Sequence, residues 1–118
     1  MGLARPIEAY QSIAQWREGL AAQWGGDPLA DDPEKLEILA AFCEFTGQDP
    51  DQLVAFCFLR KKDSGARFGS AVRQKELAER IRAWKETLGL PPRQAQARQN
   101  QILSFLIHNG VSIQMGIG

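Results

Sequence analysis

The chain marks the beginnings and ends of its helices clearly. Asp32-Pro33-Glu34 and Asp49-Pro50-Asp51 each place a side-chain acceptor at the N-cap, a proline at the first helical position and an acid in the first turn. Gly47 lies between them and is typical of a left-handed helix end. These signals predict helices over residues 33–46 and 50–61.

Three further helices are predicted from residues 7–24, 70–88 and 92–109. Apolar residues recur at three- and four-residue steps in each, and Gly25-Gly26, Gly89-Leu90-Pro91-Pro92 and Asn109-Gly110 close them. We therefore expect an all-α fold, a compact bundle of four core helices with an additional N-terminal helix. Whether residues 7–24 pack on their own bundle or on a neighbouring protomer stays open from the sequence.

With 118 residues the chain is long enough for one core. We divide it into an N-terminal helix and loop (1–32), a core helical domain (33–110) and an extended apolar tail (111–118). The tail is predicted to be a linker or a partner surface. Residues 61–70 are predicted to be a polar, basic loop with one aromatic residue, Phe68.

Several classes of function are not supported by the residues present. No apolar run approaches the ~18 residues of a membrane span and the N-terminus lacks a signal peptide, so we expect a cytoplasmic protein without membrane contact. Cys43 and Cys57 lie among apolar neighbours and are predicted to be reduced core residues, with a disulfide between them as the alternative. With one histidine, His108, they cannot complete a zinc site, so we expect no metal and no cofactor. No nucleophile with its base can be assembled, and we expect no enzyme.

The formal net charge of zero conceals a division along the chain. Residues 1–58 carry three basic and ten acidic residues, whereas residues 59–98 carry eleven basic and four acidic ones. Such segregation can create a local positive potential whatever the total charge. The alternative is an ordinary solvated helix surface.

The predicted last helix begins with the polar stretch RQAQARQNQ, which contains no acid. Arginine can pair with guanine, and glutamine and asparagine with adenine, at base edges in the major groove. This favours a DNA-reading helix start, although a solvated glutamine-rich helix would have the same composition.

The order of these motifs resembles the N-terminal core-binding domain, a SAM-like domain, of tyrosine recombinases, also called phage integrases. KLEILAAFCEFTGQDPDQLVAF is similar to the first two core helices of that family and their turn. ELAERIRAWKETLGL resembles the third helix, and QNQILSFLIHNGVSI the fourth with the start of the linker. The resemblance covers about residues 33–113.

The resemblance implies a DNA-binding domain that clamps the core recombination site and is not catalytic by itself. Implied partners are double-stranded DNA, a C-terminal catalytic domain in the parent protein and further copies of the chain on the DNA. Tyr10, on an apolar stripe, is not the family's nucleophile. We expect weak, salt-sensitive binding, and the candidate DNA-binding residues are Arg60, Lys61, Lys62, Arg67, Arg93, Gln94, Gln96, Arg98, Gln99 and Asn100.

A helical protein-interaction or oligomerisation module is the alternative. It would use two tryptophans predicted to be exposed, Trp16 and Trp24, together with the apolar tail.

Overall fold

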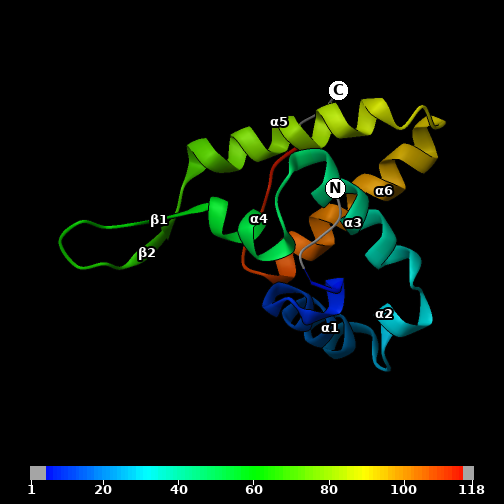
Figure 1. Ribbon diagram of the computed structural model, residues 1–118, viewed down its shortest axis with the longest axis horizontal. Helices are drawn as coiled ribbons and strands as arrows, with labels where there is room; N and C mark the ends of the chain where they lie inside the picture. Colours follow the sequence, from blue (N-terminus) through cyan, green and yellow to red (C-terminus); the bar gives the residue numbers. More distant parts are fainter. Residues whose placement is uncertain (1–4, 116–118) are drawn as a thin grey trace.

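The computed structural model describes residues 5–115, which form a compact, mostly helical domain with one small hairpin (Figure 1). The predicted helical fold class is confirmed. The elements are a 3-10 turn η1 (Ile7–Ala9), α1 (Gln11–Trp24), α2 (Pro28–Asp31), α3 (Glu34–Thr46), α4 (Pro50–Phe56), β1 (Phe58–Arg60), β2 (Arg67–Gly69), α5 (Ala71–Thr87) and α6 (Pro92–His108).

The helix boundaries follow from local side-chain capping. Asp49 accepts a hydrogen bond from the backbone N–H of Gln52 at 2.8 Å, and the Gln52 side chain accepts from the Asp49 N–H at 2.9 Å, which closes a capping box at α4. Ser70 caps α5 by accepting from the N–H of Arg73. Gly47 ends α3 with a φ of 74°. The short helix α2 lies in a stretch predicted to be a loop.

The core forms where α1, α3 and α5 pack against α6. The Trp16 and Phe105 rings meet edge to face with 5.5 Å between centroids, and the Phe42 and Trp84 rings meet at 5.3 Å. These four side chains are buried, and the indole N–H of Trp16 donates to Ser104 Oγ at 3.1 Å. The first helix therefore packs within its own chain, which answers the question the sequence left open. Trp16, predicted to be exposed, is a core residue.

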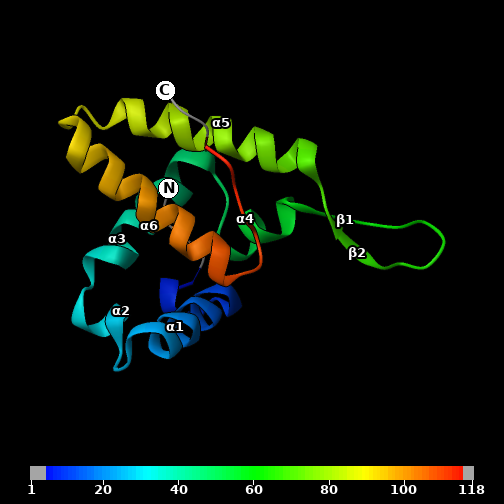
Figure 2. The ribbon, with the colours of Figure 1, turned by 180° about the vertical axis from the view of Figure 1, so that it is seen from behind.

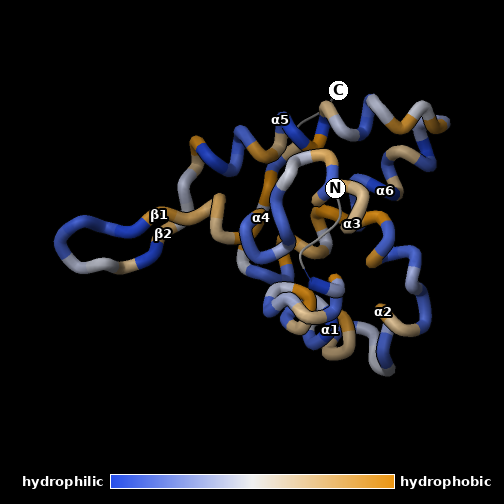
Figure 3. Tube along the Cα trace, viewed as in Figure 1, coloured by the Kyte–Doolittle hydropathy of each residue, from blue (hydrophilic) through white to orange (hydrophobic). Residues whose placement is uncertain are grey.

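The prediction of a helix over residues 50–61 is wrong beyond its first seven residues. The helix ends at Phe56, and residues 58–60 pair antiparallel with residues 67–69, with Leu59 opposite Phe68 and Arg60 opposite Arg67. The hairpin projects from the helices and its outer end is mostly hydrophilic (Figures 1 and 3). An apolar helix stripe and an apolar strand are hard to tell apart over so few residues, which explains the error.

The tail, predicted to be a linker or a partner surface, packs on its own domain over residues 111–115. It turns back from the end of α6 toward α5 (Figure 2). Val111 is buried, and Ile113 and Met115 are half-buried against the core. The Arg82 guanidinium donates to the Met115 carbonyl, which holds the end of this segment against α5. Residues 116–118 of that predicted tail, and residues 1–4 of the predicted N-terminal segment, lie outside the described residues.

Candidate nucleic-acid interface

The hairpin is closed by a short turn at its exposed end. The Lys61 N–H donates to the Ala66 carbonyl at 2.9 Å, which extends the ladder by one pair. The Gly65 N–H donates to the Lys61 carbonyl at 2.8 Å, and Gly65 has a φ of 70° that other residues rarely adopt. Backbone bonds, one glycine and short-range side-chain hydrogen bonds hold the turn, and its side chains are exposed.

Four cations lie on this hairpin beside a single acid, Asp63. Arg60 Nη1 donates to the Gly65 carbonyl at 3.1 Å, and the Arg67 guanidinium lies 3.9 Å from the centre of the Phe58 ring. Lys61 and Lys62 are exposed, and the ion pairs between described residues involve none of the four. Asp63 accepts from the N–H of Ser64. The hairpin is thus a basic ribbon whose charges face solvent.

The first half of α6 presents fewer free groups than predicted. Lys85 Nζ on α5 donates to Gln96 Oε1 at 2.9 Å, and Gln96 Nε2 donates to Asn100 Oδ1 at 3.1 Å. The Gln99 side chain is buried, so in this arrangement it cannot reach a base edge. Arg98 is half-buried. Of the predicted α6 residues, Arg93, Gln94, Gln96 and Asn100 are exposed.

The structure does not bring the two groups of predicted residues together. The hairpin precedes α5 and the start of α6 follows it, so they lie at opposite ends of that helix (Figures 1 and 2). A helix of 17 residues is about 25 Å long at 1.5 Å per residue. A single compact binding patch made from all ten residues is therefore excluded.

The cations of α5 are largely engaged within the domain. Arg82 pairs with Glu79 at 3.0 Å, and Arg80 lies 3.8 Å from Glu76 and donates to Gln48 Oε1. Arg73 lies over the Phe56 ring and donates to its carbonyl. Arg73, Arg80 and Arg82 thus have partners within the domain. The hairpin therefore carries the most accessible group of positive charges on this part of the chain.

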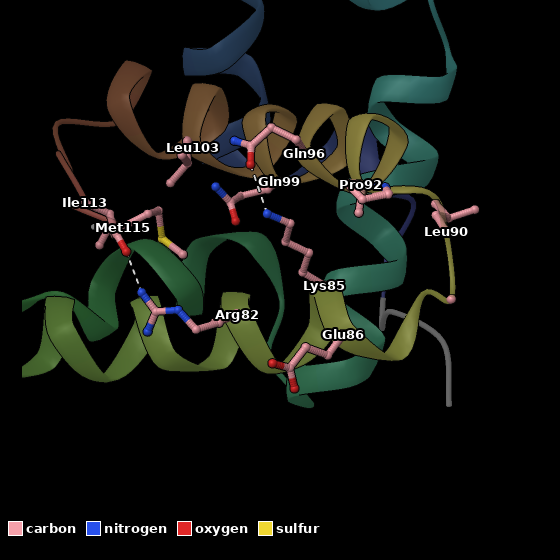
Figure 4. A pocket seen from close by; sticks show the side chains of 12 residues that line it. Arg82, Lys85, Glu86, Leu90, Pro92, Gln96, Gln99, Leu103, Ile113 and Met115 are labelled. Atoms are coloured by element: carbon pink, nitrogen blue, oxygen red, sulfur yellow. Dashed lines mark hydrogen bonds between the residues drawn. The ribbon is translucent and has the colours of Figure 1, made fainter. Parts of the chain in front are cut away.

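Gln99 points into a cavity of about 630 Å³ between α5, α6 and residues 113–115 (Figure 4). Leu103, Ile113 and Met115 supply apolar lining, and Lys85 with Gln96 supplies a polar edge. The tail forms part of the lining. This explains why a glutamine on the polar half of α6 is covered.

One structurally important carboxylate was missed by the sequence. The Asp51 side chain on α4 accepts from the Ser12 N–H at 2.8 Å and from the Ser12 hydroxyl at 2.6 Å. It caps α1 from another helix, because the N-cap residue Tyr10 makes no side-chain cap. Asn109 Nδ2 donates to the Ser12 carbonyl at 3.0 Å and adds α6 to the junction. The only sequence signal was indirect, since α1 has no acid in its own first turn.

The remaining predicted groups have structural positions. Cys43 and Cys57 are buried and free, and burial raises the thiol pKa to about 12 and about 11, with Asp49 adding to the rise at Cys43. Tyr10 is buried as predicted. In residues 5–115 no group of three or more His, Cys, Asp or Glu side chains is placed to hold a metal ion. None of the helices in this range is both long and apolar enough to cross a membrane.

No family model, no curated protein and no solved structure matches this chain. Its function must therefore be argued from its own residues and their arrangement.

Proposed function

We propose that this chain is a DNA-binding domain of the tyrosine-recombinase core-binding type, without catalytic groups of its own. The observation that carries the proposal is the exposed hairpin, on which Arg60, Lys61, Lys62 and Arg67 accompany one acid. The hairpin's cations would neutralise backbone phosphates, and the ribbon would supply the shape that fits a groove.

A two-stranded ribbon is one of the two elements that the major groove of B-DNA admits. Contacts to phosphate position a protein on the duplex but carry no sequence information. Because no acid pairs with the four hairpin cations in the described residues, little has to be broken when a phosphate binds them. We therefore expect the hairpin to bind DNA electrostatically, with little sequence specificity.

The start of α6 is proposed as a second, weaker contact. Arg93 and Gln94 are exposed there, and α6 has no acid in its first turn. The longest dimension of the domain is 46 Å, which corresponds to roughly 13 base pairs at ~3.4 Å each. A duplex lying along this axis could reach both ends, and further copies of the chain would occupy neighbouring sites.

The resemblance to recombinases assigns strand cleavage to a separate C-terminal catalytic domain. In this proposal the present chain supplies grip and orientation, and the catalytic domain supplies the nucleophile. The isolated domain would make only part of the DNA contacts of the two-domain clamp, so we expect it to bind only at low salt.

Salt-dependent binding to a fluorescent 20-base-pair duplex tests the proposal. Four phosphate contacts give a slope of about −3.6 in log affinity against log salt, or roughly a 150-fold loss between 50 and 200 mM. Lys61→Gln/Lys62→Gln should reduce the slope to about −1.8 and the loss to roughly 12-fold. Ala22→Glu/Gln23→Glu, on exposed α1 positions, changes the net charge equally and is the matched control.

If the slope of log affinity against log salt is unchanged in Lys61→Gln/Lys62→Gln, the hairpin lysines do not contact the DNA. An equal loss in the control would show that only overall charge matters. Arg93→Glu tests the α6 contact separately, and an affinity equal to that of the wild type would restrict binding to the hairpin end.

A protein-interaction module is a second candidate, and one observation favours it. Trp24 is 73% exposed at the end of α1, which is unusual for so large an apolar side chain. Sedimentation of the wild type and of Trp24→Gln over a range of concentrations tests it. Self-association that is lost in the variant would support this candidate, whereas a monomer throughout would argue against an oligomerisation surface at Trp24.

A further inference from the structure

The two faces of the hairpin carry different side chains. Residues alternate between the faces of a strand, so Leu59 and its partner Phe68 share one face while Arg60 and Arg67 share the other. Phe68 is 40% exposed, whereas Phe42 and Phe105 are buried in the core. An aromatic ring is therefore displayed on a ribbon of positive charge.

The Phe68 ring has no aromatic partner in the described part of the chain. The close ring pairs there are Trp16 with Phe105 and Phe42 with Trp84, all within the core. Phe68 lies on the projecting ribbon, opposite the half-buried Leu59. At least part of its surface remains available to a flat apolar ligand.

The other face of the ribbon carries a second flat group. The Arg67 guanidinium stacks on Phe58 at 3.9 Å, which holds the planar cation against the ribbon while the residue as a whole stays exposed. Guanidinium planes and aromatic rings are the two kinds of side chain on which nucleobases stack in proteins. The hairpin thus offers one stacking group on each face, with Lys61 and Lys62 nearby to hold the phosphates.

We propose that the hairpin binds unpaired nucleobases and so prefers DNA in which base pairs are opened. This inference rests on the proposed function and adds the state of the DNA that the site selects. In an intact duplex the faces of the bases are covered by their neighbours, so Phe68 can stack only where a base is unstacked. Stacking is sequence-tolerant, because every base has a π-face, and strengthens binding severalfold or more per base.

Binding of two fluorescent DNAs at 50 mM salt tests the inference. One is a 20-base-pair duplex, and the other is the same duplex with three central mismatched pairs that form a bubble. The wild type should bind the bubble at least about fivefold more tightly. Phe68→Val, which keeps an apolar strand-forming residue without a ring, should bring the ratio close to one, and Phe68→Tyr should restore it.

Phe45→Ala is the matched control, because Phe45 is similarly exposed, at 45%, but lies on α3. Its bubble-to-duplex ratio should equal that of the wild type. Far-ultraviolet circular dichroism checks that each variant keeps its helices.

The outcomes separate this inference from the proposed function. Equal affinity of the wild type for both DNAs overturns the preference for unpaired bases, and a raised ratio that Phe68→Val leaves unchanged overturns stacking on Phe68 as its cause. DNA binding stands in both cases. Binding to neither DNA overturns the proposed function and the inference with it.

Discussion

Removing the Asp51 carboxylate should destabilise the domain, because this group closes the junction between α1 and α4. It accepts two hydrogen bonds from the buried Ser12, at 2.8 and 2.6 Å, and the N-cap residue Tyr10 makes no side-chain cap. Hydrogen bonds to charged groups contribute about 1.5–3 kcal/mol, and loss of a helix cap costs about 0.5–2 kcal/mol. We expect Asp51→Ala to lower the free energy of unfolding by about 2–3 kcal/mol.

That change can be converted into a melting temperature. The entropy of unfolding is about 2.1 cal/mol/K per residue, or roughly 0.25 kcal/mol/K for 118 residues. The melting temperature should therefore fall by about 8–12 °C. Asp51→Asn keeps one acceptor oxygen without the charge and should lose about half as much.

Urea unfolding followed by tryptophan fluorescence measures the effect, since Trp16 and Trp84 are buried. Glu37→Ala is the matched control. Glu37 and Asp51 are both acids in the first turn of a helix, α3 and α4 respectively, but Glu37 is exposed and Asp51 is half-buried. The control removes the same helix-dipole interaction but no cap on another helix. If Asp51→Ala and Glu37→Ala differ by less than about 0.5 kcal/mol, the inter-helix cap contributes nothing and the reasoning is refuted.

Two further predictions concern packing and the thiols. Gly19→Ala should lower the free energy of unfolding in urea by about 1–3 kcal/mol, because a Cβ there would lie 2.2 Å from the ring of His108. The Nδ1 of that ring donates to the Ser104 carbonyl, which holds the ring in place. A variant as stable as the wild type would show that the ring moves aside. The buried Cys43 and Cys57 should resist alkylation in the folded state at pH 8 and react in urea. Their folded pKa values of about 12 and about 11 exceed the ordinary value of 9.0, so the thiols of the unfolded chain ionise first. The free energy of unfolding should therefore be constant below about pH 9 and fall as the pH rises toward 11–12. A urea midpoint that stays constant from about pH 8 to about pH 10.5 would contradict this.

The helical part of the fold was predictable because its signals are short-range. Asp49, Ser70 and Gly47 act on backbone groups within a few residues, so their identity determines where helices begin and end. The hairpin was not predictable in the same way. Each strand has three residues, and the apolar pattern of α4 continues into Phe58 and Leu59 without a break.

The candidate site was predicted in its residue types but not in its arrangement. Which glutamine of α6 is covered depends on a tail that turns back over the helix, and Gln96 is engaged by Lys85 from a neighbouring helix. The Asp51 cap joins residues 39 positions apart. None of these contacts has a local sequence pattern, because each is created by the packing of whole elements.

Under the proposed function, the position of the acids would influence which end of the domain attracts phosphate more strongly. Lys35 at the start of α3 pairs with Asp32 at 3.8 Å and donates to Gln101 on α6 at 3.2 Å, so Asp32 lies on the α6 side of the domain. The hairpin projects from the opposite end of the domain, well away from α2 and the start of α3 (Figure 1). Charges separated by more than about 10 Å are largely screened at 0.1 M salt, so Asp32 weakens the potential at α6 more than at the hairpin. Asp51 of α4 is the acid on the hairpin side, because it lines a pocket together with Arg67. Under the proposed function, a chain of zero net charge would hold a phosphate backbone through the hairpin, because the ion pairs between described residues involve none of its four cations.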